Sequence, residues 1–260
     1  MGARAMRYEA APARREAILA KVRADGFCSI SDLAGELAVS DMTVRRDVRR
    51  LDELGEVRVV HGGVSVPPGQ DFGARAHANA GSKNRIGAAA AALIRPADTI
   101  AVDAGTTTYA LVDALPAAFT GSVVTHSVPV MQALLDRPGS GCVGLGGDLY
   151  APSRAFVGPA TVEAAARLRV RWCFLGAAAV DTRGCYGVYD LERPTKQALM
   201  DIADHVVLMA DAGKFEGSAP VLLARLERLH TIVTDARPPK AIRSALDAAG
   251  VRVVVAKENG

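Results

Sequence analysis

The sequence predicts two domains, a small helical domain followed by a larger α/β domain built on a mostly parallel sheet. Residues 1–66 contain short helical patterns with clustered arginines, whereas residues 72–260 alternate β-branched runs with alanine-rich helical stretches. Continuous apolar strands separated by helices are typical of a parallel sheet that is covered on both faces. The prolines and glycine within residues 65–70 indicate a linker between the two domains.

The composition is that of an ordinary globular protein. The chain has 260 residues and a mass of 27.1 kDa, with 50% hydrophobic and 23% charged residues. These fractions exclude a mostly disordered, collagen-like or coiled-coil chain. Aromatic residues make up only 5%, fewer than a base-stacking platform for single-stranded nucleic acid needs. The net charge of +3 is too small to identify a nucleic-acid partner, so the distribution of charge must decide.

The cysteines and the apolar runs predict a simple cellular setting. The four cysteines form no C-x-x-C pair, and no histidine stands beside them at zinc-like spacing. We therefore expect reduced thiols, no metal and no cofactor. No apolar run approaches the roughly 18 residues of a membrane span, and residues 1–12 lack the apolar core of a signal peptide. The sequence predicts a cytoplasmic protein without a membrane partner.

The N-terminal domain has the pattern of a winged helix-turn-helix. Helices are predicted over residues 12–24, over a short segment with Ser31 as its N-cap, and over residues 41–54 with Ser40 as N-cap. Residues 56–60 and the segment near Val64 are expected to form a β-hairpin around His61. Three short helices followed by such a hairpin are typical of this DNA-binding fold.

The third helix separates apolar from cationic side chains. At about 100° per residue, one arc carries Val44, Val48, Leu51 and Leu54. The opposite arc carries Arg45, Arg46, Arg49 and Arg50. Such a helix can enter the major groove, where Arg45 or Arg46 would bond guanine and the other arginines would neutralise phosphates. Met42 and Thr43 are placed to touch thymine methyl groups.

A solvated charge face with i,i+4 pairs is the alternative interpretation of these arginines. The preceding helix, the tight turn and the wing favour DNA binding. The glycines beside His61 would let the wing approach a phosphate or the minor groove. The residues expected to contact DNA are Ser31, Ser40, Met42, Thr43, Arg45, Arg46, Arg49, Arg58 and His61.

The second domain contains seven predicted strands. They span residues 99–103, 123–125, 142–145, 172–175, 206–209, 231–234 and 251–255. Helices are predicted between most of them, over residues 84–94, 109–115, 130–135, 160–168, 195–203 and 240–249. This alternation predicts a Rossmann-like sheet, in which the carboxyl ends of the strands share the edge where ligands bind.

An anion-binding loop is predicted where the first of these strands ends. The segment Asp103-Ala104-Gly105-Thr106-Thr107-Thr108 follows the strand and opens a helix. Backbone N–H groups at a helix N-terminus, together with threonine hydroxyls, suit an anion such as a sugar phosphate. A plain strand–turn–helix with threonine caps explains the same residues, so the motif alone leaves both interpretations open.

Polar residues also follow several later strands and would meet this loop at the sheet edge. Lys214 is expected to pair with a phosphate, and Asp103 or Asp181 to accept bonds from sugar hydroxyls. The expected effector-binding residues are Asp103, Gly105, Thr106, Thr107, Thr108, Thr125, Ser127, Gly146, Gly147, Asp181, Lys196 and Lys214.

These motifs resemble the DeoR family of bacterial transcription regulators. Residues 40–47, SDMTVRRD, resemble the family's VS-x-x-TIRRDL signature, and residues 58–64 resemble its HGGA-containing wing. Asp103 to Thr108 is similar to the family's D-x-GTTT loop, and residues 211–215, DAGKF, to its DSSKF segment. Further matches are Arg75, Asn79, Lys83, Thr125 to Ser127 with His126 in place of Asn, residues 145–147, residues 174–176, Glu192 and Lys196.

The resemblance implies a C-terminal domain similar in fold to ribose-5-phosphate isomerases that binds a phosphorylated sugar or a sugar-derived effector. It implies a homo-oligomer, dimer or tetramer, and a repressor that leaves double-stranded operator DNA of a carbohydrate operon when the effector binds. The leading hypothesis is therefore a metabolite-responsive transcription regulator rather than an enzyme.

Two other functions remain open from the residues alone. A sugar-phosphate isomerase or kinase-like enzyme would need a general base, for which Asp103, Asp181 and Glu192 are candidates by type. The arginine-rich N-terminal domain is superfluous for that chemistry, so no catalytic residue is predicted. The other possibility is a DNA-binding protein whose second domain only oligomerises.

Overall fold

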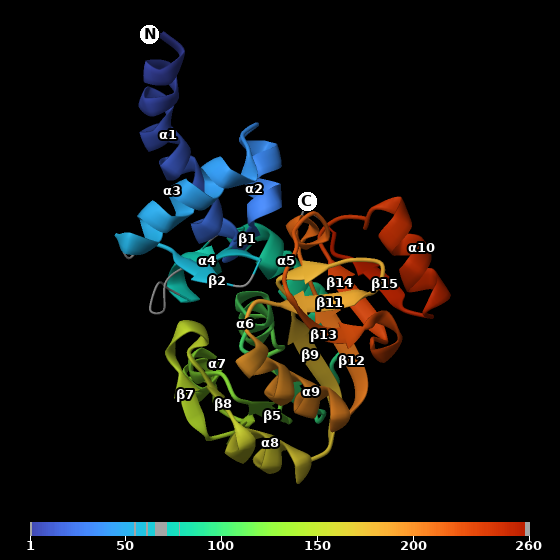
Figure 1. The fold of residues 1–260 in the computed structure, drawn as a ribbon. Coiled ribbons are helices and arrows are strands. Elements are labelled where there is room, and N and C mark those ends of the chain that lie inside the picture. The colour runs from blue at the N-terminus through green and yellow to red at the C-terminus, as the bar shows by residue number, and fades with distance from the viewer. Residues whose placement is uncertain (1, 55, 61, 66–71, 78, 258–260) are drawn as a thin grey trace.

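The computed structural model describes residues 2–257 except 55, 61, 66–71 and 78. The helical N-terminal domain sits at one end of the α/β domain, and α1 (Gly2–Asp25) projects from it (Figure 1). His61 and the predicted linker beyond Ser65 lie outside the described residues. Both predicted fold classes, the winged helix-turn-helix and the mostly parallel α/β sheet, are confirmed.

The N-terminal domain packs three helices on a small antiparallel sheet. After α1 come α2 (Ile30–Glu36) and α3 (Asp41–Glu53). The sheet has the order β1-β3-β2, formed by β1 (Phe27–Ser29), β2 (Arg58–Val60) and β3 (Gly63–Ser65). β2 and β3 are the predicted wing, and β1 adds a third strand that the sequence pattern did not predict. The fully buried side chains Ile18, Val22 and Val44 hold the three helices together.

Three expectations for this domain were wrong in detail. The N-cap of α2 is Ser29, whose Oγ accepts the Asp32 N–H at 3.0 Å, and not Ser31. Pro12 lies inside α1 instead of starting it. Leu54 is 59% exposed, because it is the C-cap of α3 and turns away from the apolar arc.

All seven predicted strands are present and form one parallel sheet. They are β4 (Thr99–Val102), β5 (Ser122–Thr125), β6 (Gly141–Gly144), β9 (Val170–Gly176), β12 (Ala203–Met209), β14 (Thr231–Thr234) and β15 (Arg252–Val255). The strand order is β15-β14-β12-β9-β4-β5-β6. The chain starts in the middle at β4, adds β5 and β6 on one side, and then continues from β9 on the other. The boundary between β4 and β9 is therefore a topological switch point, where ligands of such sheets bind.

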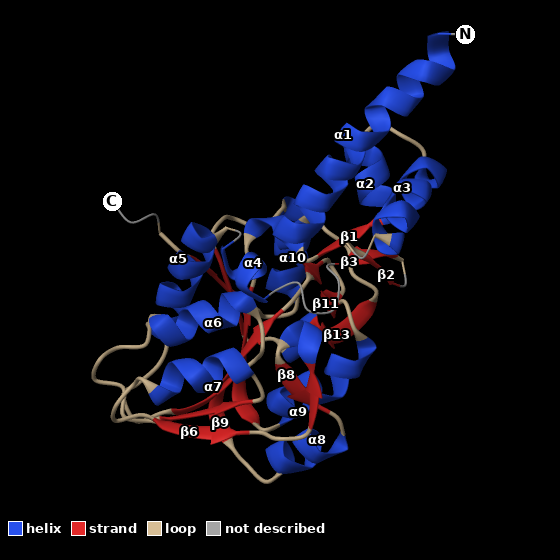
Figure 2. Ribbon diagram, turned by 90° about the vertical axis from the view of Figure 1, so that its left-hand side faces the viewer, coloured by secondary structure: helices blue, strands red, loops and turns tan. Residues whose placement is uncertain are grey.

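Helices cover both faces of the sheet (Figure 2). One face carries α5 (Ala80–Ala91), α6 (Thr106–Asp113) and α7 (Val128–Leu135). The other carries α8 (Pro159–Ala166), α9 (Arg193–Asp201) and α10 (Lys240–Ala248). Along β9 the side chains alternate between the two cores, with Phe174 in the first and Cys173 and Leu175 in the second.

Several short elements were not predicted from the sequence, because elements of two to six residues are too short to show a clear hydrophobic periodicity. They are α4 (Phe72–His77), the hairpin β7 (Asp148–Tyr150) and β8 (Ala155–Val157), and the sheet of β10 (Ala179–Val180), β11 (Gly184–Gly187) and β13 (Val221–Arg225). Four 3-10 helices, η1 (Ala151–Ser153), η2 (Asp190–Glu192), η3 (Ala212–Phe215) and η4 (Leu226–Arg228), complete the fold.

The described chain contains neither a membrane-spanning helix nor a cluster of metal-binding side chains. Its helices are too short or too polar to cross a membrane. Its histidines, cysteines and acids nowhere gather in groups of three or more that could hold a metal ion. The four cysteines are free thiols.

Candidate functional site

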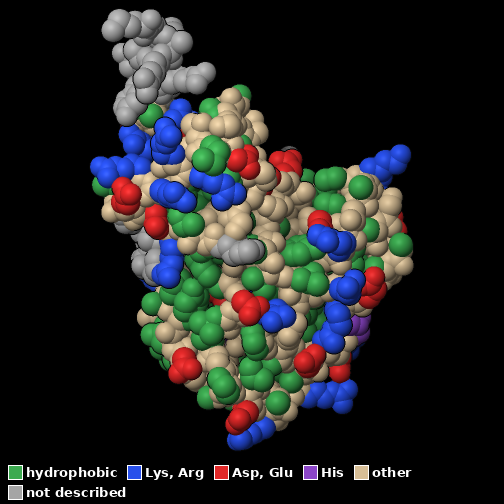
Figure 3. All heavy atoms as spheres, viewed as in Figure 1, with side chains coloured by type: hydrophobic (Ala, Val, Ile, Leu, Met, Phe, Trp, Pro, Cys, Tyr) green, Lys and Arg blue, Asp and Glu red, His purple; other side chains and the backbone are tan. Residues whose placement is uncertain are grey.

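The helix α3 presents a cationic face to solvent. Ser40 caps it, with its Oγ accepting the Thr43 N–H at 3.3 Å. Arg45, Arg46 and Arg49 are exposed, and within the described chain no ion pair joins them to an acid. Lys and Arg side chains gather over this part of the molecule (Figure 3). Arg50 differs from them, because it pairs with Glu53 at 2.9 Å.

Asp47 holds α3 against α1. The sequence places this acid at the edge of the helix, but its side chain is only 7% exposed and accepts from Arg14 Nε at 2.5 Å. A buried carboxylate requires such a partner, because burying an unpaired charge is costly. The ion pair therefore helps to fix the orientation of α3 relative to α1.

A groove of about 100 Å³ separates α3 from the wing. Arg45 and Arg49 line its helix side, and Val59 lies on its wing side. The Val59 N–H donates to Asp52 Oδ1 at 3.2 Å, which ties the wing to the helix. Of the other expected DNA contacts, Met42, Arg58 and Ser31 are exposed, and His61 lies outside the described residues.

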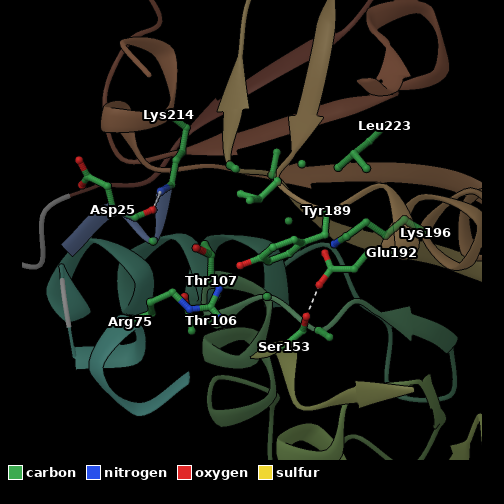
Figure 4. Close-up of a pocket in the computed structure, with 18 of the residues that line it drawn as sticks. Asp25, Arg75, Thr106, Thr107, Ser153, Tyr189, Glu192, Lys196, Lys214 and Leu223 are labelled. Carbon is green, nitrogen blue, oxygen red and sulfur yellow. Dashed lines mark hydrogen bonds between the residues drawn. The ribbon is translucent and has the colours of Figure 1, made fainter. Parts of the chain in front are cut away.

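A pocket of about 120 Å³ opens at the switch point, where β4 and β9 end (Figure 4). Of the expected effector residues it brings together Gly105, Thr106, Thr107, Lys196 and Lys214. It is also lined by Arg75 from α4, Lys83 from α5, Ser153, Tyr189 and Glu192, and by Asp25 and Gly26 at the end of α1.

The N-terminus of α6 forms the floor of this pocket. Gly105 is its N-cap, and Thr106 and Thr107 begin the helix. The first N–H groups of a helix have no intrahelical acceptor, so they suit an anion. A Cβ at Gly105 would lie 3.6 Å from Gly176 Cα and 3.1 Å from Thr108 Oγ1. The distance to Gly176 is ordinary van der Waals contact, so the tighter restriction at Gly105 comes from the Thr108 hydroxyl of its own loop.

Positive charge dominates the pocket. Arg75, Lys83, Lys196 and Lys214 face two acids, Asp25 and Glu192. Burial lowers the pKa of Lys83 to about 8, and the charges of Lys214 and Arg75 act in the same direction. Asp211 and Asp25 oppose the shift but do not cancel it. A lysine whose pKa is lowered by burial and by neighbouring positive charges would be stabilised in its charged form by a bound anion.

Asp103 lies beneath the pocket and holds Lys196. Its side chain is fully buried, accepts from Lys196 Nζ and from the Gly176 N–H at 2.9 Å, and lies 3.1 Å from His126 Nε2. Burial raises the pKa of Asp103, but Lys196 and His126 outweigh it and hold this pKa below its ordinary value. The expected bond from Asp103 to a sugar hydroxyl is not supported, because its oxygens are already occupied and it does not line the pocket.

The remaining expected effector residues also lie outside the pocket. Thr108 Oγ1 is engaged with its own loop, accepting the Gly105 N–H at 3.0 Å. Thr125 Oγ1 donates to the Val102 carbonyl at 2.7 Å, and Ser127 caps α7. Asp181 accepts two backbone N–H groups in the turn between β10 and β11. Gly146 and Gly147 follow β6, the edge strand farthest from β9 on that side of the sheet.

Two family descriptions match most of the chain. A DeoR-like helix-turn-helix domain matches residues 14–69, and a DeoR C-terminal sensor domain matches residues 78–236. The chain belongs to the DeoR family. The helix-turn-helix match contains α3 and the wing, and the sensor-domain match contains the floor and most of the walls of the pocket.

Curated DeoR-family relatives align over nearly the whole chain. The HTH-type transcriptional regulator YgbI of Escherichia coli K12 is 31% identical over 94% of this chain and 97% of its own. The glycerol-3-phosphate regulon repressor of E. coli K12 is 28% identical over 90% and 94%. The L-fucose operon activator of Haemophilus influenzae is 29% identical over 87% and 92%.

Solved structures show only distant likeness. The sorbitol operon regulator SorC of Klebsiella pneumoniae has a TM-score of 0.39 at 13% identity, covering 84% of this chain and 93% of its own. Ribose 5-phosphate isomerase A of Methanocaldococcus jannaschii has a TM-score of 0.38 at 15% identity, covering 51% and 53%.

His126, which replaces Asn in the DeoR-like motif, lies outside the pocket. It is 1% exposed, and its two ring nitrogens contact the Phe156 carbonyl at 2.8 Å and Asp103 at 3.1 Å. The substitution therefore acts on the support of Lys196 and not on the pocket surface.

Some pocket residues gave no signal in the sequence. Ser153 ends the short 3-10 helix η1, Tyr189 lies in an irregular segment, and Asp25 and Gly26 come from the other domain. Only the three-dimensional packing brings them to the end of β4. Among the acids considered as a catalytic base, Glu192 alone lines the pocket, where it accepts from Ser153 Oγ.

Proposed function

We propose that this DeoR-family protein is a transcription regulator whose operator affinity is controlled by a phosphorylated sugar bound at the end of β4. The observation that carries the proposal is one cationic pocket on the N-terminus of α6, in a chain that also exposes an arginine-bearing α3. The relatives that are named repressors support repression as the outcome.

The DNA side of the proposal uses α3 and the wing. Arg45, Arg46 and Arg49 have no acid to neutralise them in the described chain, so they are available to guanine edges and phosphates. The protein would bind repeated half-sites on double-stranded DNA as a homo-oligomer, a dimer or tetramer.

In the proposed binding mode, the phosphate end and the sugar end of a small ligand contact different walls of the pocket. The phosphate would accept from the first N–H groups of α6 and from Arg75, Lys83 and Lys214. The sugar hydroxyls would lie toward Glu192, Ser153 and Tyr189, which offer both donors and acceptors. The cavity of about 120 Å³ suits a small metabolite better than a dinucleotide.

Gel shifts and calorimetry test the two sides separately. The DNA is the region upstream of the protein's own operon, and the ligands are ribose 5-phosphate, glucose 6-phosphate and glycerol 3-phosphate, with the unphosphorylated compounds as controls. We expect a sequence-specific shift that a phosphorylated ligand weakens. Absence of sequence preference at physiological salt would overturn the DNA assignment. Failure of every phosphate ester to bind would leave the C-terminal domain as an oligomerisation module, and turnover of a ligand would make the protein an enzyme.

Removing the charge of Lys214 is expected to weaken binding of the active ligand about tenfold, because one charge-assisted hydrogen bond to phosphate is lost. The measurement is calorimetry on Lys214→Met with the best ligand of the panel. Lys240→Met, which removes an exposed lysine of α10 that does not line the pocket, is the matched control. Equal affinities of the two variants would place the phosphate elsewhere.

Effector affinity is expected to fall as the pH rises above about 8, the pKa of Lys83 in the free protein. A bound phosphate raises the pKa of Lys83, so above about pH 8 the complex holds a proton that the free protein has lost. Affinity is then fully present below this pH and decreases by up to about tenfold per pH unit above it. Calorimetry in two buffers of different ionisation enthalpy measures the proton uptake, and Lys83→Met should abolish it. A flat affinity from about pH 7 to about pH 9.5 would contradict this role of Lys83.

A further inference from the structure

The DNA-binding domain forms one wall of the pocket. Ala24, Asp25 and Gly26, where α1 ends, lie among the residues that line it. Figure 4 shows Asp25 beside Lys214, with Thr106 and Thr107 across the pocket from them. A ligand in the pocket therefore lies next to the end of the longest helix of the other domain.

Lys214 joins the sensor domain to that helix end. Its Nζ donates to the main-chain carbonyl of Asp25 at 3.3 Å, across 189 positions of sequence. Carbonyls at a helix C-terminus lack intrahelical donors and carry the negative end of the helix dipole, so they attract an ammonium group. Gly26 sets this geometry, because its φ of +79° ends the helix and its N–H returns to the Val22 carbonyl at 2.8 Å.

A second contact between the domains also ends on a pocket residue. Tyr189 Oη and Ser65 Oγ are 2.9 Å apart, and Ser65 is the last residue of the wing strand β3. Tyr189 packs edge-on against Tyr150, which holds its ring in the wall of the pocket. Both contacts thus connect the DNA-binding domain to side chains that a ligand would touch.

We infer that a phosphate-bearing effector competes with the DNA-binding domain for the pocket, and that Lys214 is the group for which they compete. This inference rests on the proposed function, because it assumes that the pocket binds an anion. A phosphate accepts stronger hydrogen bonds from Lys214 than the neutral Asp25 carbonyl does. The same anion is repelled by the Asp25 carboxylate and by the negative end of α1. Effector binding therefore favours a state in which α1 has left the pocket, and this difference between the two states is what coupling requires.

Because domain docking and effector binding are thermodynamically linked, the inference can be tested by changing a docking contact on the DNA-binding domain, outside the pocket lining. If effector and docked domain exclude each other, any change that weakens docking must strengthen effector binding by the same factor. Ser65→Ala removes the contact with Tyr189 without touching the pocket lining, so it should tighten binding about fivefold, the worth of one ordinary hydrogen bond. Tyr189→Phe removes the same contact from the other partner and should act in the same direction on inorganic phosphate, which carries no sugar hydroxyl to meet the Tyr189 side chain. Ser244→Ala, at an exposed position on α10, is the matched control and should change nothing.

The experiment uses the full chain with inorganic phosphate as the probe, followed by calorimetry and by hydrogen exchange on the same samples. We expect phosphate to bind, to speed exchange of the Gly26 amide about fivefold, and to leave the buried strand β12 unchanged. Phosphate that binds while exchange at Gly26 stays constant or slows would overturn the competition and leave the proposed function intact. An unchanged affinity in Ser65→Ala and Tyr189→Phe would overturn it as well. No heat of binding at any concentration would instead remove the anion pocket, and the competition with it.

Discussion

Asp103→Asn is expected to lower the free energy of unfolding by about 3–5 kcal/mol, because it leaves Lys196 buried without its counter-charge. Lys196 is 6% exposed, and its ammonium group has Asp103 as its ion-pair partner. Burial lowers the pKa of Lys196, but Asp103 and, to a smaller extent, Glu192 raise it more, so the pKa lies above its ordinary value. Chemical denaturation at neutral pH, monitored by circular dichroism, measures the loss.

A double variant separates the charge effect from other damage at this site. Lys196→Met alone leaves the carboxylate unpaired, whereas Asp103→Asn with Lys196→Met removes both charges and should be less destabilised than the sum of the single variants. Asp247→Asn on the exposed face of α10 is the matched control and should cost less than about 0.5 kcal/mol. Strict additivity would show that the pair is not coupled.

The same pair gives a pH signature with a defined sign. The pKa of Asp103 is held below its ordinary value in the folded protein, so its contribution is present at neutral pH and is lost as the pH falls below about 4. The difference in stability between the wild-type protein and Asp103→Asn should therefore narrow at acid pH. A difference that is constant across this range would indicate that lost packing, and not lost charge, causes the defect.

The parts of the fold that follow from periodicity were predictable, and the parts that follow from packing were not. Strands such as β9 and β12 contain the apolar runs 172–175 and 206–209, and the whole parallel sheet could be located from runs of this kind. The hairpin of β7 and β8 and the small sheet around β11 are too short to give a pattern. The sequence predicts Ser31 as the N-cap of α2, but the extended backbone of Ser29 and its bond from the Asp32 N–H make Ser29 the cap.

The residues of the candidate site divide in the same way, into those that local sequence patterns predict and those that only packing brings to the site. Gly105, Thr106 and Thr107 were found because one contiguous loop carries them, and Lys196 and Lys214 because each occurs in a motif. Asp103 belongs to the same loop, yet it points below the sheet edge into the protein, since its backbone position is still that of the strand end. Asp25 required the packing of two domains, and Tyr189 lies in a loop without periodicity, so no local pattern locates either of them.

Arg45→Ala is expected to weaken operator binding by about 1–3 kcal/mol and to relax the preference at one base pair. Arg45 lies in the first half of α3, the part of a recognition helix that faces base edges, and it also lines the groove beside the wing. Its exposed guanidinium group has no ion-pair partner in the described chain, so it meets DNA without first giving up a protein contact. Binding to a set of operators with single base changes, at several salt concentrations, measures both effects.

Arg50→Ala is the matched control, because it removes the same charge from the same helix at a residue already paired with Glu53. It should weaken all operators less than Arg45→Ala does and leave the base preference intact. If Arg45→Ala instead weakens every sequence equally and makes the salt dependence shallower by about one counterion, Arg45 contacts a phosphate and a neighbour reads the base. Arg46 is then the next residue to replace, since it is equally exposed and lies one position further along the helix.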